Sequence, residues 1–213
     1  MAVNRGCLAT AMLFCTLGSL VGAATAAEID SGATQIGFTL KTRWGQSLHG
    51  RFPRHHGELE TLPDDHRRAR LVMSARDVEI VDHPSYTAMT RGKGFFEADR
   101  FPDVEFVSDP FPARMLVEGG KLGGYLTIRG IRRHETFSIA PGECARPALD
   151  CESVASGSVR RSDYGVDRWV LAVSDRVRFV LRLRARENAM QRDADKTPVK
   201  ADALAAGRAE RGP

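Results

Sequence analysis

The sequence lacks an apolar run long enough to cross a membrane as a helix. Its longest such run extends from Leu8 to Val21, about 14 residues, whereas a membrane span needs about 20. Arg5 is the only charge near this run, and Ala24-Thr25-Ala26 offers small residues for cleavage. These features favour a secretory signal peptide over residues 1–27 instead of a transmembrane anchor, and therefore a periplasmic or secreted protein.

Cysteine is scarce, and the spacing of the four that occur excludes the common cysteine sites. Cys7 and Cys15 belong to the expected signal peptide, which leaves Cys144 and Cys151 for the exported chain. A redox site needs a C-x-x-C spacing, and a structural zinc site needs a second pair of ligands. In an exported protein the two cysteines favour a disulfide, with free thiols as the alternative. Closing so short a loop would stabilise the fold by about 2–3 kcal/mol.

Enzyme and metal motifs are missing as well. No G-x-S-x-G nucleophile motif occurs. We expect the glycines of residues 119–124 to form a hairpin turn and not a phosphate loop, because no helix follows them. A metal site needs several converging ligands, but the six histidines are scattered, and the adjacent His55 and His56 would face opposite sides of a strand. These absences predict no catalysis, no metal and no cofactor.

The charge pattern argues against nucleic-acid binding. The formal net charge is only +4, and aromatic residues make up 7% of the chain. Arginines are scattered along the predicted strands and do not cluster with aromatic side chains, as nucleic-acid binding requires. No nucleic-acid partner is therefore expected.

Residues 28–187 are long enough for one domain with a hydrophobic core. The tail that follows, residues 188–213, lacks aromatic residues and carries mixed charges with no periodic apolar face. Such a segment buries too little surface to offset its ordering entropy. The tail is therefore predicted to be disordered.

Within the domain, apolar residues recur with a period of two, which predicts strands. The alternating segments are 35–41, 67–73, 122–128, 137–139 and 177–185. The last is the strictest, with apolar residues on one face and three arginines among the four residues on the other. We expect one continuous strand there, with one buried and one solvated face.

Turn-forming residues separate these segments: Gly57, Pro63-Asp64-Asp65, Asp109-Pro110, Gly119-Gly120 and Pro141-Gly142. Many short alternating strands with one apolar face predict an all-β antiparallel barrel or sandwich.

One short helix is expected at residues 83–91. Pro84 suits the first turn of a helix, and Ser85 can cap it.

Four sequence elements in a fixed order carry a family resemblance. They are Ile36–Leu40 with Trp44-Gly45 and Gly50-Arg51-Phe52; Phe95-Phe96 with Phe101-Pro102-Asp103-Val104-Glu105-Phe106; Gly124-Tyr125-Leu126-Thr127-Ile128-Arg129-Gly130; and Ser162-Asp163-Tyr164-Gly165. Together they resemble the YceI-like family of lipid-binding β-barrels. The resemblance implies a single extended, lipocalin-like antiparallel barrel of about eight strands.

The resemblance also implies a function. YceI-like proteins are secreted or periplasmic and hold a long isoprenoid chain, as a polyprenyl phosphate or an isoprenoid quinone, in the lumen. A barrel of this size can enclose one slender ligand, and apolar burial at about 25 cal/mol per Å² supplies affinity without many polar contacts. The expected partner is a long-chain amphiphilic lipid, exchanged with a membrane donor or acceptor. A homodimer is compatible with the sequence.

The inward faces of the predicted strands give the residues expected to line the lumen: Phe38, Leu40, Leu48, Phe52, Leu71, Met73, Phe95, Phe96, Phe106, Leu126, Ile128, Phe179 and Leu181. Trp44 is expected at the entrance, because an amphipathic ring suits that place, and residues 83–89 are expected at the mouth of the barrel. The candidates for an anionic headgroup are Arg43, Arg91 and Arg129. The alternatives are ordinary core packing for the apolar residues and solvated strand edges for the arginines.

A different class of function stays open. If Phe38, Phe52, Phe96 and Phe179 converge and plug the lumen, the protein would be a filled barrel, acting as an envelope stress or interaction protein without a lipid ligand. The volume of the lumen discriminates between the two. An enzyme acting on an amphiphile would need titratable groups in the lumen, and the predicted inward faces hold almost none.

Overall fold

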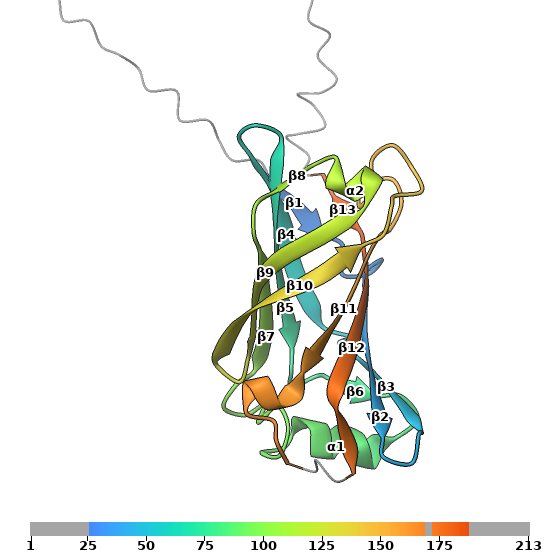
Figure 1. The fold of residues 1–213 in the computed structure, drawn as a ribbon, viewed down its shortest axis with the longest axis vertical. Helices are drawn as coiled ribbons and strands as arrows, with labels where there is room; N and C mark the ends of the chain where they lie inside the picture. The colour runs from blue at the N-terminus through green and yellow to red at the C-terminus, as the bar shows by residue number, and fades with distance from the viewer. Residues whose placement is uncertain (1–25, 169–171, 188–213) are drawn as a thin grey trace, which may run out of the picture.

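The computed structural model describes residues 26–168 and 172–187 (Figure 1). The expected signal peptide lies outside these residues except for Ala26 and Ala27, which form the first half of strand β1 (Ala26–Ile29). The tail at 188–213 also lies outside them. Within the described residues, no helix combines the length and the apolar character of a membrane span.

One antiparallel sheet contains all thirteen strands of the described residues. After β1 these are β2 (Gln35–Thr42), β3 (Ser47–Arg51), β4 (His55–Leu62), β5 (His66–Ser74), β6 (Glu79–Ile80), β7 (Asp103–Ser108), β8 (Phe111–Pro112), β9 (Gly120–Ile128), β10 (Ile131–Ile139), β11 (Ser153–Arg160), β12 (Val173–Leu183) and β13 (Ala185–Arg186).

The sheet curls around an apolar interior. Its order is β13-β1-β4-β5-β7-β9-β10-β11-β12-β2-β3-β6, with β8 paired to β5 off this path. Because β13 follows β12 after a single residue, this segment of chain pairs with β2 along β12 and with β1 at β13. The result is an elongated barrel with β8 and β13 at its upper end and β6 at its lower end (Figure 1). The predicted all-β, lipocalin-like antiparallel barrel is confirmed.

The structure has more strands than the eight expected because it also contains several strands of only two to five residues. The eight strands with six or more residues are β2, β4, β5, β7, β9, β10, β11 and β12. The strand expected to run unbroken over 177–185 is interrupted at Arg184. There the Arg184 N–H donates to Thr34 Oγ1 at 3.0 Å, and its carbonyl accepts from the Asp30 N–H at 2.8 Å. These two bonds occupy the place where the neighbouring strand changes from β2 to β1.

The aromatic rings of the inward face lie over strand glycines. Phe179 pairs with Gly157 on β11 and with Phe38 on β2, and Phe38 in turn pairs with Gly50 on β3. A Cβ atom added at Gly50 would lie 2.0 Å from the Phe38 ring. The same addition at Gly157 would lie 2.6 Å from the ring of Phe137. These rings therefore occupy space that a side chain on the neighbouring strand would otherwise fill.

A third ring, that of Phe106, uses the space above Gly124 in the same way, since a Cβ atom there would lie 2.6 Å from it. Rings placed over glycines lie against the barrel wall instead of extending straight into the lumen. The alternation of large and small residues across neighbouring strands thus keeps part of the lumen hollow.

The predicted helix is present, and two further short helical segments were not predicted. Helix α1 (Pro84–Arg91) begins with Pro84 in its first turn, but His83 is the N-cap residue and no side chain caps it, so the expected role of Ser85 was wrong. Helix α2 (Met115–Glu118) and the 3-10 turn η1 (Arg161–Tyr164) have four residues each. Segments of this length are too short to show helical periodicity.

Two turn predictions based on glycine were also wrong. Gly57 lies inside β4, paired with Leu71, because the backbone of β5 approaches it too closely for a side chain. Gly119 ends α2 with a φ of 79°, and residues 120–124 belong to β9, so no hairpin forms there. The connection from β7 to β9 contains β8 and α2 instead.

Gly57→Ala should destabilise the protein, because the added Cβ would lie 2.2 Å from the backbone oxygen of Arg70. Relief requires a shift of β5, and overpacking of this kind costs about 1–3 kcal/mol. Gly37→Ala is the matched control, since its Cβ would come no nearer than 3.5 Å to another atom and should change stability by less than about 0.5 kcal/mol. Urea unfolding measures both values, and equal losses would contradict the prediction.

Candidate functional site

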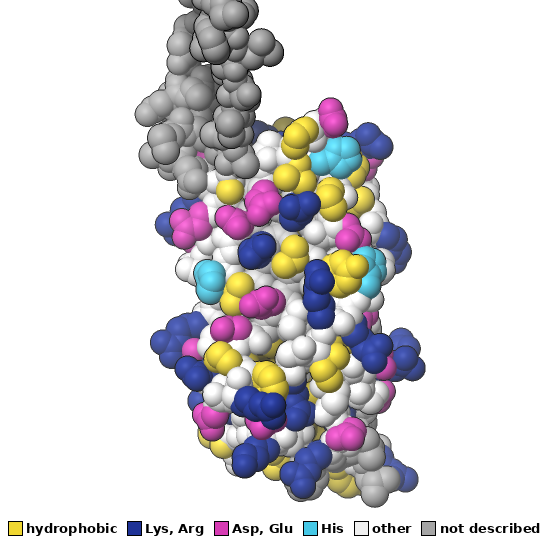
Figure 2. Space-filling view, turned by 90° about the vertical axis from the view of Figure 1, so that its left-hand side faces the viewer, with side chains coloured by type: hydrophobic (Ala, Val, Ile, Leu, Met, Phe, Trp, Pro, Cys, Tyr) yellow, Lys and Arg dark blue, Asp and Glu magenta, His cyan; other side chains and the backbone are white. Residues whose placement is uncertain are grey.

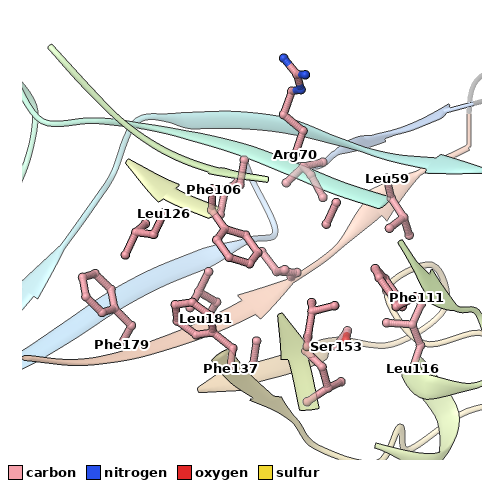
Figure 3. Close-up of a pocket in the computed structure, with 18 of the residues that line it drawn as sticks. Leu59, Arg70, Phe106, Phe111, Leu116, Leu126, Phe137, Ser153, Phe179 and Leu181 are labelled. Atoms are coloured by element: carbon pink, nitrogen blue, oxygen red, sulfur yellow. The ribbon is translucent and has the colours of Figure 1, made fainter. Parts of the chain in front are cut away.

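The upper half of the barrel encloses an apolar cavity, called here the upper cavity (Figure 3). Its free volume is about 70 Å³, several times the roughly 10–15 Å³ that one water molecule needs. It is lined by Ile29, Leu59, Ala69, Arg70, Leu71, Met73, Phe106, Phe111, Leu116, Leu122, Leu126, Phe137, Ile139, Ala148, Ser153, Ala155, Phe179, Leu181 and Leu183.

Polar side chains contribute very little to this lining. The exposed side chain of Arg70 points away from the cavity (Figure 3). Ser153, which is buried, supplies the one hydroxyl among the described residues of the lining. The upper cavity therefore offers an apolar chain a dry surface and offers a charged group no partner.

A second apolar cavity, the lower cavity, lies toward α1 and has a free volume of about 50 Å³. Its lining shares only Phe179 with that of the upper cavity. The lining residues are Phe38, Leu40, Thr90, Phe95, Phe96, Ile128, Val159, Arg161, Tyr164, Val166, Val177 and Phe179.

Four phenylalanine rings form a chain of contacts that begins at Phe179, the residue shared by the two cavities. The ring centroids of Phe38 and Phe179 are 6.0 Å apart, those of Phe38 and Phe52 are 5.5 Å apart, and those of Phe52 and Phe96 are 5.8 Å apart. The rings therefore converge, which is the arrangement expected of a filled barrel. They divide the lumen without filling it, because free volume remains on both sides.

The charged side chain in the lining of the lower cavity, Arg161, donates its hydrogen bonds to backbone carbonyls. The guanidinium of Arg161, which is 5% exposed, donates at 2.6–3.1 Å to the carbonyls of Val166, Arg168, Val173 and Ser174. Burial lowers the pKa of Arg161 from its ordinary value. This side chain ties η1 to the start of β12 and is a structural cation instead of a free anion-binding group.

Tyr164 is the other titratable group of the lower cavity. It is fully buried, and its hydroxyl donates to Glu135 Oε1 at 2.7 Å. Burial, followed by the hydrogen bond to the Glu135 carboxylate, raises the pKa of Tyr164 above its ordinary value. The phenol thus stays protonated and has its one proton in use.

The structure distributes the predicted lumen residues over the two cavities. Six line the upper cavity: Leu71, Met73, Phe106, Leu126, Phe179 and Leu181. Phe179 is shared with the lower cavity, which also takes Phe38, Leu40, Phe95, Phe96 and Ile128. Leu48 and Phe52 are buried but line neither cavity.

Sequence reasoning missed 13 of the 19 residues of the upper lining. Leu122, Phe137 and Ile139 lie on alternating segments that were predicted as strands, so the same pattern contained the signal. Phe111, Leu116 and Ala148 come from β8, α2 and the disulfide loop. Elements this short carry no periodicity by which their buried residues could be recognised.

The predicted entrance and headgroup residues lie outside the upper cavity. Trp44 is 81% exposed, on the turn between β2 and β3 at the lower end. Arg129 pairs with Glu97 at 3.0 Å, and the Arg91 Nε donates to the Val78 carbonyl at 2.9 Å. The side chain of Arg43 is exposed. Neither cavity therefore gains a cation from these three arginines.

The upper end of the barrel is closed by the loop that carries the two cysteines. Cys144 and Cys151 form a disulfide with a Cα–Cα distance of 6.1 Å. Ala148, inside this loop, is buried and lines the upper cavity. The carbonyl of Ala148 also accepts a 2.6 Å hydrogen bond from the N–H of Ala185 on β13. The disulfide loop thus holds one wall of the upper cavity against β13.

The charges of the outer surface and the residues of the two linings show what else the protein could bind. On the face in Figure 2, basic and acidic side chains are interspersed along the barrel wall. Among the described residues, no three His, Cys, Asp or Glu side chains gather as metal ligands. The cavities can enclose an apolar chain, and they present it with no paired nucleophile and base.

A curled antiparallel sheet around an apolar interior defines the class of this protein as a lipocalin-like barrel. Comparison with known families shows that the YceI-like domain matches residues 28–185. The chain therefore belongs to the YceI-like family, which confirms the resemblance carried by its motifs. No protein with a curated function matches the sequence.

Solved structures with the same fold include two whose chains are covered almost completely. BcnA of Burkholderia cenocepacia superposes with a TM-score of 0.61 at 19% identity, over 73% of this chain and 98% of BcnA. A polyisoprenoid binding domain from Saccharophagus degradans, implicated in plant cell wall breakdown, gives a TM-score of 0.60 at 12% identity, over 78% and 99%. At these identities the similarity establishes the fold.

The buried Tyr164 predicts a loss of stability in alkali. Its pKa is raised above the ordinary value of 10.0 in the folded state, so the unfolded chain releases this proton first. Below about pH 9 the contribution of Tyr164 to stability does not change with pH, and above about pH 10 its ionisation in the unfolded chain lowers the free energy of unfolding by up to about 1.4 kcal/mol per pH unit. In Tyr164→Phe this contribution is absent.

Urea unfolding of both proteins at about pH 8 and about pH 11 measures the difference. Tyr164→Phe should be less stable at the lower pH, by about 1 kcal/mol for the lost hydrogen bond, and should lose less stability on the way to the higher pH. Equal losses in the two proteins would contradict the assignment.

Proposed function

We propose that the protein is a periplasmic or secreted carrier that holds a long-chain isoprenoid lipid, a polyprenyl phosphate or an isoprenoid quinone, in the barrel lumen. The upper cavity is the observation that carries this proposal, because its lining is apolar except for Ser153. Membership of the YceI-like family supports the ligand class, as does the structural similarity to a polyisoprenoid binding domain.

Apolar burial supplies the affinity that such a lining can give. Each buried CH₂ group contributes about 0.8 kcal/mol, so a chain of several isoprene units gains many times that amount. The free volume of about 70 Å³ is much smaller than such a chain. Loading therefore requires side chains of the lining to change rotamer and move apart, and part of the binding energy is used for this.

Export supports the same proposal. The expected signal peptide over residues 1–27 would direct the chain out of the cytoplasm. The Cys144–Cys151 disulfide is of the kind that persists in oxidising compartments. An apolar ligand needs a protein carrier in such a compartment because it is insoluble in the water between membranes.

The filled barrel without a lipid remains the second candidate function. Two observations favour it: four phenylalanine rings lie in contact with one another inside the barrel, and the free volume of each cavity is small. An envelope stress or interaction protein would keep these rings packed at all times. A carrier must move them.

Organic extraction and mass spectrometry of protein purified from its own host separate the two candidates, together with native mass spectrometry of the intact protein. The carrier should contain one lipid per chain, with the mass pattern of repeating isoprene units. A clean apo mass, with no uptake of added quinone or polyprenyl phosphate, would overturn the carrier and support the filled barrel.

Phe179→Arg should abolish lipid loading, because Phe179 lines both cavities and an unpaired charge in an apolar lumen is strongly unfavourable. Native mass spectrometry after incubation with an isoprenoid quinone should show no adduct. Val180→Arg introduces the same charged side chain one residue further along β12, on the outer face. This variant should load lipid as the wild type does.

Ala155→Leu serves as a second variant if Phe179→Arg does not fold. Ala155 lines the upper cavity, and a larger apolar side chain fills the space without adding charge. Loading should fall several-fold. Wild-type loading in folded protein of both variants would show that the lipid binds elsewhere.

The lower end of the barrel suits contact with a membrane that donates or accepts the lipid. Its exposed large apolar side chains are Trp44, Val81, Tyr86 and Met89. Exposed cations flank them in the sequence, with Lys41 and Arg43 before Trp44 and Lys93 after Met89. Amphipathic aromatic rings with nearby cations are typical of surfaces that bind anionic membranes. The proposed partner at this end is therefore a bilayer containing anionic phospholipid.

Trp44→Ala should weaken co-sedimentation with phosphatidylglycerol vesicles several-fold, because it removes the most exposed apolar side chain of that end. Tyr125→Ala is the control, since Tyr125 is an exposed aromatic residue on β9, in the barrel wall. Binding by the wild type should also fall as salt rises. Equal vesicle binding by all three proteins would contradict a membrane contact at the lower end.

A further inference from the structure

The rings of Phe38 and Phe179 lie between two cavities that are otherwise built from different residues. Phe179 belongs to both linings, and Phe38 belongs to the lower one. Their ring planes are tilted by 44° with centroids 6.0 Å apart. With the rings in this position, a chain in the upper cavity ends against Phe179 and cannot continue toward α1.

The ring pair lies between two glycine positions whose side-chain space is already filled by rings, Phe38 itself over Gly50 and Phe137 over Gly157. Gly50 and Gly157 flank the pair on the neighbouring strands, so each ring has one neighbour without a side chain. At Gly50 the missing side chain leaves the space that the far end of the Phe38 ring occupies. A phenylalanine side chain changes rotamer about χ1 between staggered positions, while rotation about χ2 turns the ring itself.

We propose that Phe38 and Phe179 form a gate that sets the length of isoprenoid chain the barrel can hold. With the gate closed, the upper cavity takes the chain end of a short isoprenoid. When the two rings swing apart, the two cavities join into one lumen, and a long chain passes through. This inference rests on the proposed lipid-carrier function and adds to it the residues that select among lipids.

Gly50 gives a way to test the gate without changing a lining residue. A Cβ atom at Gly50 would lie 2.0 Å from the end of the Phe38 ring, so Gly50→Ala should push that ring away from the wall and into the lumen. The gate would then favour its closed position. Phe38→Leu has the opposite effect, because it shortens the side chain and opens a path past Phe179.

The probes are two polyprenols of the same chemistry, the short geranylgeraniol and the long solanesol, supplied together from detergent micelles. Native mass spectrometry gives the ratio of long to short chains bound by each protein. Gly50→Ala should lower this ratio about tenfold, which corresponds to a modest difference in binding free energy. Phe38→Leu should raise it by a similar factor.

Two controls separate the gate from general effects on packing. Phe101→Leu makes the same substitution as Phe38→Leu at a residue that lines neither cavity. Gly37→Ala makes the same substitution as Gly50→Ala where the added atom has room. Both should keep the wild-type ratio.

The outcomes distinguish failure of the gate from failure of the carrier. Opposite shifts in Gly50→Ala and Phe38→Leu, with unchanged controls, support the gate. Loading of both polyprenols by the wild type, with the same ratio in every variant, overturns the gate and leaves the carrier in place. Loading of neither polyprenol by any protein overturns the proposed function, and the gate with it.

Discussion

The packing of phenylalanine rings over strand glycines is the constraint on which the interior of this barrel depends. A small closed barrel tends to fill with its own side chains, and native interiors are close-packed. Here Phe38, Phe106 and Phe137 lie over Gly50, Gly124 and Gly157, where a Cβ atom would overlap each ring. The rings bury apolar surface against the wall and leave space beside them. Stability and a hollow lumen are thereby obtained from the same residues.

This packing also determines how the lumen is divided. Phe38 and Phe179 are directly paired on adjacent strands, so the position of one ring limits the positions open to the other. The upper cavity is bounded by the disulfide loop and α2 at one end and by Phe179 at the other. Apolar walls of this kind discriminate poorly between headgroups, because they offer almost no directional contacts. Length and width of the chain are what such a cavity can select.

The sequence predicted the parts of this arrangement that follow from period-two alternation. The inward positions of Phe38, Leu71, Leu126 and Phe179 could be recognised because each lies in a long strand in which apolar residues recur at every second position. The role of the glycines could not be predicted, because a glycine indicates a turn as readily as the close approach of two strands. Gly57 was assigned to a turn for that reason. The walls formed by Phe111, Leu116 and Ala148 depend on tertiary contacts of short segments, which no local pattern reveals.

The buried polar groups explain why the lumen can remain neutral. Arg161 donates to four backbone carbonyls, and Tyr164 donates to Glu135. Each polar group therefore has its partners within the protein before any ligand arrives, and burial without such partners would cost several kcal/mol. A lipid that enters the lower cavity meets groups that are already satisfied. Its headgroup, if charged, is more stable in water outside the barrel than in either cavity. The binding energy must then come from the chain, which makes the gate between the cavities the natural place for selectivity.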